Sequence, residues 1–307
     1  MQFLSQEQKG ALYAILSGLC YGLLGYFGVS LMNEHLSVYN ILGWRFLVSS
    51  LCMVVLVLPQ YSIIFQRPQE IFHVIVSGAL FYSGSSIFYF VACRYIGTGL
   101  SMVTFFTYPA FVMFLQWLFY RKKITKVYHA AVVIFIIGMS FLVDFSNCSF
   151  DLFGLGISIV GALSYACYVV ISKKNKLSPL VSTLMVSLGC MVTCFSAAFV
   201  EGSFTVPSGL YVWMYILCLG LLCTAIPILL LLEGLKYISA EKASLLSVLE
   251  PVFVVIFGIV LLNEKLSPLQ FVGMIIIMCG GVLTLFSHKI NPEKIIARWL
   301  KSFHKKK

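Results

Sequence analysis

A glutamate and a proline stand next to each other in the middle of a long apolar run. Glu250 and Pro251 lie within residues 240–262, which are otherwise mostly hydrophobic. A charged side chain is costly in apolar surroundings, so Glu250 is a candidate for binding a cationic group or carrying a coupling proton. Proline removes a backbone donor and kinks a helix. A structural role therefore stays open as well, in which protonated Glu250 bonds a neighbouring helix where Pro251 frees a carbonyl.

An arginine occupies a second apolar run, residues 36–58. The guanidinium of Arg45 is a planar fork that holds a carboxylate or a phosphate through two hydrogen bonds. The structural alternatives are that its side chain extends to lipid headgroups or pairs with an acid inside the protein. If Arg45 and Glu250 face one cavity, the pair suits a zwitterion such as an amino acid.

Hydroxyl-bearing side chains recur inside the apolar runs. A buried tyrosine offers an apolar ring and one hydrogen bond, so it can line a binding pocket, although it also serves as ordinary packing material. Tyr108, with Pro109 beside it, occupies the position that corresponds to Glu250 in the internal repeat described below. The further site candidates are Tyr82, Tyr89, Tyr108, Tyr165 and Ser247, and the expected helix kinks are at Pro109 and Pro251.

The elements that must position these residues follow from the composition. Of the 307 residues, 60% are hydrophobic and 10% charged, whereas soluble domains carry about 25% charged residues. A helix needs about 20 apolar residues to cross a bilayer. We therefore expect an all-α integral membrane protein with ten transmembrane helices, at about 10–31, 36–58, 71–93, 98–120, 127–145, 152–172, 179–199, 209–232, 240–262 and 268–287.

The basic residues predict the orientation. If the N-terminus is cytoplasmic, nearly all Lys and Arg fall in segments on the cytoplasmic side, including residues 121–126 and 173–176. We therefore expect both termini to be cytoplasmic in a multi-pass protein of the cell (inner or plasma) membrane. The formal charge of +10 lies between apolar runs rather than on one polar face, which argues against a nucleic-acid partner.

The final segment, residues 288–307, is a separate basic tail. The Asn-Pro pair at 291–292 can start a helix, with Ile295, Trp299 and Leu300 on one face and basic side chains toward the other. Such a helix would lie on the anionic inner leaflet of the bilayer. The alternative is a solvated, frayed tail.

The chain also matches itself. At an offset of 142 residues, 94–96 (Arg-Tyr-Ile) aligns with 236–238 (Lys-Tyr-Ile), and Pro109 aligns with Pro251. Each half holds five expected spans, and an odd number forces the second half to begin on the opposite side of the membrane. We therefore expect two inverted five-helix repeats, 1–145 and 146–287. Inverted repeats are a recurring architecture of secondary transporters, with the substrate site near the midplane.

Short motifs mark both halves. Residues 249–253 (Leu-Glu-Pro-Val-Phe) and 262–268 (Leu-Asn-Glu-Lys-Leu-Ser-Pro) belong to the second half, and 44–46 (Trp-Arg-Phe) and 108–109 (Tyr-Pro) to the first. With these motifs the chain resembles the EamA family of the drug/metabolite transporter (DMT) superfamily, from the first span to the last. The resemblance implies a ten-helix inverted-repeat fold and the export or exchange of metabolites, amino acids or drugs. The chain departs from the family at 121–123, where Arg-Lys-Lys replaces a common Gly-Glu.

These features predict a secondary transporter that exports or exchanges a small metabolite, such as an amino acid, by alternating access. A nucleotide-type or lipid-linked substrate is the alternative within transport, and Arg45 would suit it better than Glu250. A membrane-embedded enzyme is a weaker hypothesis, because the chain has no His-Glu-x-x-His and no nucleotide-binding glycine-rich motif with lysine. The ten cysteines form no Cys-x-x-Cys pair, and no metal or other cofactor is expected. The oligomeric state stays open.

Overall fold

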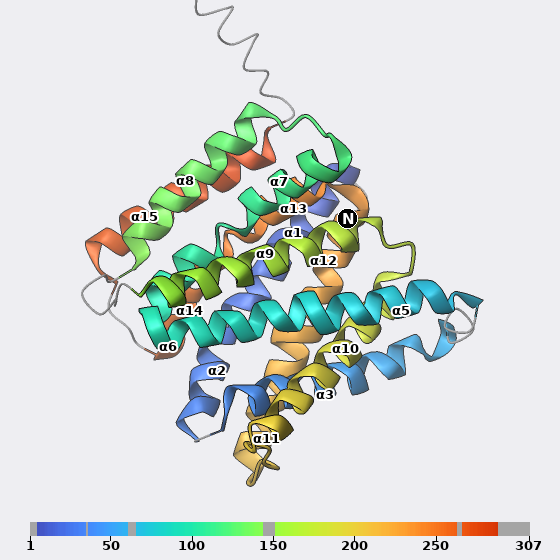
Figure 1. The fold of residues 1–307 in the computed structure, drawn as a ribbon. Helices are drawn as coiled ribbons and strands as arrows, with labels where there is room; N and C mark the ends of the chain where they lie inside the picture. The colour runs from blue at the N-terminus through green and yellow to red at the C-terminus, as the bar shows by residue number, and fades with distance from the viewer. Residues whose placement is uncertain (1–4, 35, 61–65, 144–150, 263–265, 288–307) are drawn as a thin grey trace, which may run out of the picture.

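The computed structural model describes residues 5–34, 36–60, 66–143, 151–262 and 266–287, and these form an assembly of helices without strands (Figure 1). The predicted all-α fold is confirmed. The tail at 288–307 and the expected boundary between the halves at 145/146 lie outside the described residues. The helices are α1 (Gln6–Gly22), α2 (Leu24–Asn33), α3 (Val38–Val57), η1 (Leu58–Gln60), α5 (Pro68–Ser77), η2 (Gly78–Tyr82), α6 (Ser83–Phe105), α7 (Tyr108–Tyr120), α8 (Lys126–Leu142), α9 (Leu152–Lys174), α10 (Pro179–Val200), α11 (Leu210–Gly220), η4 (Leu221–Ala225), α12 (Ile226–Tyr237), α13 (Ala240–Ser247), α14 (Glu250–Leu262) and α15 (Pro268–Leu285).

Eight helical runs in the described part of the chain are long and apolar enough to cross a membrane, and α8 is a shorter apolar helix. The count of ten spans is therefore not confirmed. One reason is the run Pro68–Phe105, which covers the third expected span and the start of the fourth. The chain breaks helical geometry inside this run at Gly97, where φ is +77° and ψ is 160°. Glycine alone adopts this backbone conformation readily, so one long run contains two helices that differ in direction.

Serine and proline residues set the beginnings of several helices. The hydroxyl groups of Ser37, Ser178, Ser239 and Ser267 accept backbone N–H groups in the first turns of α3, α10, α13 and α15. Proline stands in the first turn of α5, α7, α10 and α15, where its missing N–H removes no helical hydrogen bond. These signals explain why the helices begin where they do within an almost uniformly apolar sequence.

Equivalent contacts recur in the two halves. Gly10 of α1 packs against Tyr237 and Ile238 at the end of α12, and Gly154 of α9 packs against Tyr95 and Ile96 of α6. In each case a Cβ atom on the glycine would come within 2.9 Å of the partner helix, so the small residue allows close helix contact. The contacts pair the first helix of each half with a helix of the other half.

The centre of the bundle holds a second pair of equivalent elements. η2 and η4 are both single π-helical turns, one in the α5–α6 run and the other in the α11–α12 run. Gly78 begins η2 and packs against the backbone of Val186 in α10, while Gly220 precedes η4 and packs against Val48 and the backbone of Arg45 in α3. α3 and α10 are themselves joined by a hydrogen bond of 2.8 Å between Ser49 and Ser187.

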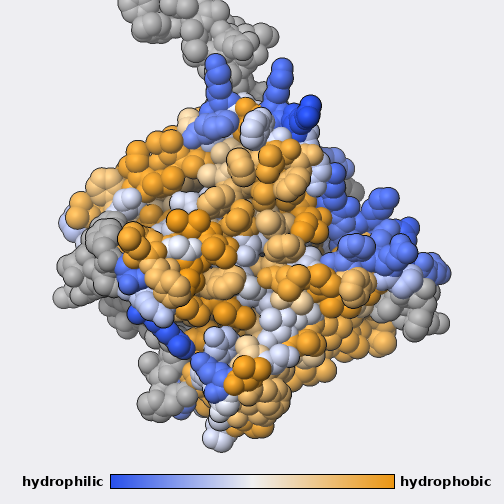
Figure 2. Space-filling model, in the orientation of Figure 1, coloured by the Kyte–Doolittle hydropathy of each residue, from blue (hydrophilic) through white to orange (hydrophobic). Residues whose placement is uncertain are grey.

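The surface is that of a membrane protein. Large apolar side chains such as Leu51, Val55, Phe119, Val260 and Met278 are exposed. Hydrophobic residues cover most of the face in Figure 2, and strongly hydrophilic residues gather at its upper and right-hand edges, with a smaller group at the lower left. In Figure 1 the connection from α7 to α8 and the beginning of α5 lie at these edges. The apolar belt between polar ends fits a multi-pass protein that spans a bilayer.

Candidate functional site

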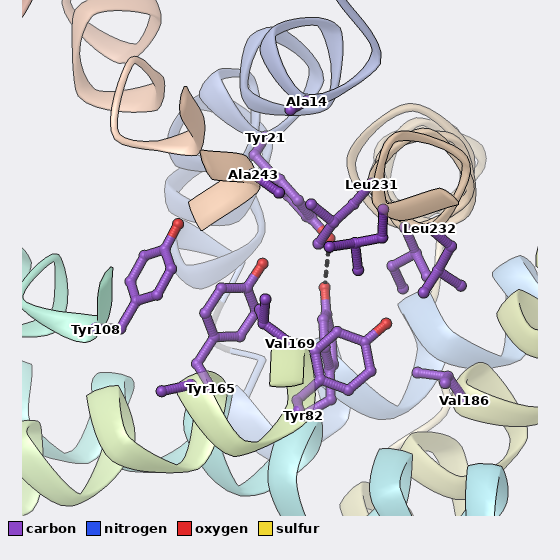
Figure 3. Packing of buried hydrophobic residues seen from close by; sticks show 14 of the residues in the cluster. Ala14, Tyr21, Tyr82, Tyr108, Tyr165, Val169, Val186, Leu231, Leu232 and Ala243 are labelled. Atoms are coloured by element: carbon purple, nitrogen blue, oxygen red, sulfur yellow. Dashed lines mark hydrogen bonds between the residues drawn. The ribbon is translucent and has the colours of Figure 1, made fainter. Parts of the chain in front are cut away.

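A cavity of about 180 Å³ lies among helices of both halves, and aromatic side chains form most of its wall. Tyrosines from α1, η2, α7 and α9 point into the same interior region in Figure 3. The sequence candidates Arg45, Tyr82, Tyr89, Tyr108, Tyr165 and Glu250 all line this cavity, together with Tyr21, Leu24, Ser85, Ser86, Phe90, Met102, Phe105, Phe106 and Val254.

The tyrosine rings hold one another in place. The rings of Tyr108 and Tyr165 stand perpendicular, with centroids 4.7 Å apart. The hydroxyl oxygens of Tyr21 and Tyr82 lie 2.8 Å apart, the hydrogen bond drawn in Figure 3. Tyr108 donates its hydroxyl to the backbone oxygen of Ser244 in α13, at 3.1 Å. Edge-to-face packing and these hydrogen bonds give the cavity a rigid aromatic wall.

Arg45 brings a positive charge to the cavity wall. Its side chain belongs to α3 and is only 3% exposed, and its guanidinium carbon lies 4.6 Å from the ring centre of Phe46. The Nε atom has no hydrogen-bond partner. None of the four ion pairs found among the described residues involves Arg45. A buried guanidinium without a counter-ion is costly, and an anionic group of a ligand would offset that cost.

Glu250 brings the opposite charge. It is the first residue of α14 and retains some accessible surface, in contact with the cavity. Within the part of the chain that the structure describes, its carboxylate takes part in none of the ion pairs. The N-terminal end of a helix carries a partial positive charge, which favours a carboxylate there. Tyr82 lies near enough to interact electrostatically with both Glu250 and Arg45.

Both expected helix kinks are short turns that interrupt the helix. α6 ends at Phe105 and α7 begins at Tyr108, with Pro109 in its first turn. In the same way α13 ends at Ser247 and α14 begins at Glu250, with Pro251 following. The equivalent positions Tyr108 and Glu250 therefore both stand at the start of a helix beside the cavity. The interrupted helices thus place the side chains of Tyr108 and Glu250 at the cavity wall.

Ser247 is the sequence candidate that does not line the cavity. It is buried in the last turn of α13, and its hydroxyl donates to the backbone oxygen of Ala243 at 3.1 Å. Tyr21, Phe105 and Phe106 line the cavity but were not among the site candidates. Tyr21 aligns with Tyr165 at a repeat offset of 144, and that match is the signal that identifies it. No group of three or more metal-ligating side chains occurs in the described ranges.

The cavity ends at Glu250 on the side of α13. Its wall includes Glu250 and Val254 of α14 and no residue of α13, and all eight residues of α13 are buried. Two ion pairs hold the start of this helix. Lys122, which follows α7, lies 2.9 Å from Glu241, and Lys242 lies 2.6 Å from Glu7 of α1. A buried helix tied by ion pairs, which accepts a hydrogen bond from Tyr108 of the cavity wall, thus lies behind this part of the wall.

Comparison with known proteins gives matches along nearly the whole chain. The EamA-like transporter family matches twice, at residues 8–144 and 152–286. The uncharacterized transporter YxxF of Bacillus subtilis (strain 168) is 23% identical over 290 residues, covering 91% of this chain and 90% of that protein. The uncharacterized transporter YetK of the same organism is 26% identical over 281 residues, covering 86% and 82%. One solved crystal structure has the same fold, with a TM-score of 0.76 at 17% identity over 89% of this chain and 95% of the other.

Proposed function

Because the chain belongs to the EamA-like transporter family, within the DMT superfamily, we propose that it is a secondary transporter of small zwitterionic metabolites such as amino acids. It exports or exchanges them across the cell membrane by alternating access, with both termini cytoplasmic and the basic tail on the anionic inner leaflet. Membership of a transporter family indicates a multi-pass membrane protein that moves a small molecule.

One observation carries the choice of substrate. Arg45 and Glu250 line the same cavity, and neither charge takes part in an ion pair among the described residues. A zwitterion places a carboxylate against the guanidinium and an ammonium group against the carboxylate, so one molecule satisfies both charges. The ring faces of the tyrosines add attraction for the ammonium group. A ligand without charged groups would leave both buried charges without a partner.

The size of the cavity limits the substrate. Its volume of about 180 Å³ is below the roughly 300–1,000 Å³ of pockets that take drug-sized ligands. A small metabolite fits this space better than a nucleotide or a lipid-linked molecule. The second candidate is a small phosphate-bearing substrate, which the unpartnered Nε of Arg45 favours.

Two features support alternating access. The helices that end and restart at the cavity, α6–α7 and α13–α14, come from different halves of the chain. Broken helices at the interface of two repeats are the common way in which transporters build a substrate site. In addition, the buried helix α13 lies behind part of the cavity wall, which fits a conformation that is occluded toward the end where Lys122 lies.

The test is a thermal-shift panel on the purified protein in detergent. The panel contains L-amino acids, their methyl esters, the matching carboxylic acids without the amine, and small phosphate compounds. A ligand at about a hundred times its dissociation constant stabilises the folded state by about 2.7 kcal/mol. We expect amino acids to raise the melting temperature of the wild type, and esters and deaminated acids to have little effect.

Variants connect the shift to the cavity. Glu250→Gln and Arg45→Gln should lose the stabilisation, while Glu233→Gln should retain it, because Glu233 is paired with Lys236 away from the cavity. A shift from phosphate compounds alone that is lost in Arg45→Gln would replace the zwitterion by the second candidate. Stabilisation that persists in both cavity variants would refute the site, and uptake assays in liposomes would then show whether transport survives the same substitutions.

A further inference from the structure

A second cavity, of about 290 Å³, lies at the other end of α9 and is lined mainly by polar residues. It is enclosed by the end of α9, the connection that follows it, the first turns of α10 and the end of α12. Its polar lining includes Ser172, Asn175 and Ser182 and three lysines, Lys173, Lys176 and Lys236. Nothing in the central site accounts for this cavity.

The three lysines do not have the same role. Lys173 donates to the backbone oxygens of Leu235 and Ile238, so it caps the end of α12. Lys236 contacts Glu233 at 3.0 Å with its side chain 47% exposed. Lys176 is exposed and takes part in none of the ion pairs of the described residues. Three positive charges and one negative charge therefore surround the cavity, and its net charge favours an anion.

One face of α9 connects the two cavities. Tyr165 lines the central cavity and Ser172 lines the basic one. Tyr168 lies between them on the same face, since residues three and seven positions apart share one side of a helix. Tyr168 is completely buried, and the side chain of Ser172 lies close enough to interact with its hydroxyl. A buried tyrosine hydroxyl therefore lies beside a serine that lines the basic cavity.

Apolar packing separates the cavities. Val169 of α9, Val186 of α10, and Leu231 and Leu232 of α12 are all buried. In Figure 3, Leu231, Leu232 and Val186 lie on the side of the tyrosine cluster away from Tyr108, and Val169 appears between Tyr165 and Tyr82. Leu232 also lines the basic cavity. Along α9 the barrier extends from Tyr165 to Ser172, about two helical turns.

We propose that the basic cavity is a second binding site, which takes the oxyanion group, carboxylate or phosphate, of a soluble solute at the far end of the path that leads to the central cavity. Lys176 and Lys236 contact the oxyanion, and the Ser172 and Ser182 hydroxyl groups are available to donate to it. The place of this site on a transport path rests on the proposed function, whereas binding itself does not.

The test measures protection of individual lysines from acetylation. The full-length protein is placed in nanodiscs of phosphatidylcholine and treated with an amine-acetylating reagent, in inorganic phosphate or in chloride at equal ionic strength. We expect acetylation of Lys176 and Lys236 to slow at least threefold in phosphate. Lys174 is the matched control, because it follows Lys173 but lies over the ring of Tyr120, 3.7 Å from its centre. Its rate should not change.

Three results would overturn the proposal. The first is no protection by phosphate. The second is equal slowing at Lys174, which would indicate general screening. The third is protection that appears only when phosphatidylglycerol is added to the nanodiscs, which would assign the cavity to a lipid headgroup.

A variant series separates this site from the central one. Stabilisation by inorganic phosphate in a thermal-shift assay should disappear in the double variant Lys176→Gln/Lys236→Gln and persist in Lys174→Gln. It should also persist in Arg45→Gln and Glu250→Gln. If Arg45→Gln and Glu250→Gln abolish the stabilisation by phosphate and the double lysine variant does not, phosphate binds in the central cavity. The second site is then refuted. Loss of amino-acid binding at the central cavity would leave this result unaffected.

Discussion

Residues 238–242 and 96–100 occupy equivalent positions in the two halves, yet they are built from different chemistry. In the second half, Glu241 and Lys242 are buried and each forms an ion pair with the other half of the chain. In the first half, the equivalent residues are Gly99 and Leu100. Gly99 packs directly against Val143, whose Cγ1 would lie 2.6 Å from a Cβ atom at this position. One segment is held by charges and the other by apolar contact.

The backbone breaks at the start of these two segments also differ. Ile238 is extended, and Ser239 caps α13 by accepting the N–H of Lys242. In the first half, Gly97 makes the break through its positive φ. The comparison shows that both repeats interrupt the helix at the same place. The residues that make the interruption differ between the two halves. Ion pairs require particular partners, whereas apolar contact tolerates sliding, so the two segments should respond differently to substitution.

The largest expected effect is that of Lys122→Ala. Glu241 is 1% exposed, so the substitution leaves a buried carboxylate without its main partner. Breaking a buried pair in this way costs about 3–5 kcal/mol, and we expect about 3 kcal/mol because Lys173 stays within electrostatic range of Glu241. Chemical unfolding in detergent measures the loss.

Two further variants check its cause. Glu241→Gln in the Lys122→Ala background should recover much of the lost stability, because it removes the buried charge. Glu70→Ala breaks the exposed pair Arg67–Glu70 and should cost no more than about 1 kcal/mol. If Lys122→Ala lowers the free energy of unfolding by as little as Glu70→Ala does, the buried ion pair contributes no special stability. The contrast between residues 238–242 and 96–100 would then be refuted.

Gly97→Ala should have the next largest effect. A Cβ atom is strained at φ of +77° and ψ of 160°, and such conformations cost about 1–3 kcal/mol for residues other than glycine. The control is Gly156→Ala in α9, where a Cβ atom would meet nothing within 4 Å. That change should be neutral or stabilising by up to about 1 kcal/mol. Melting temperatures of both variants, measured together, test the difference.

Ser239→Ala should have the smallest effect of the three. It removes the side-chain cap of α13, and losing such a cap typically costs about 1 kcal/mol. Ser239→Asp should retain most of the stability, because aspartate also caps helices. A loss in Ser239→Ala well above 2 kcal/mol would mean that the ion pairs of Glu241 and Lys242 depend on this cap, and the charged segment would then be a single cooperative unit.

Much of the fold could be predicted from apolar runs, because helices that span a bilayer must be long and hydrophobic. The central site was partly predictable, since Glu250 and Arg45 are conspicuous in apolar surroundings. Glu241 was not identified, because its partner Lys122 is 119 residues away in the chain and only the fold brings them together. The conformation of Gly97 could not be predicted either, since a glycine in an apolar run indicates close packing as readily as a positive φ.

The matching π-helical turns η2 and η4 bear on the history of the chain. A π turn contains one residue more than the α-helical turn that it replaces, so it records a single-residue insertion. The two turns begin at Gly78 and Leu221, within one residue of the 142-residue repeat offset. Two independent insertions at one place in both halves would be a coincidence. The simplest account is that a shorter ancestor, equivalent to one of the two matched repeats, already carried the insertion, and gene duplication copied it.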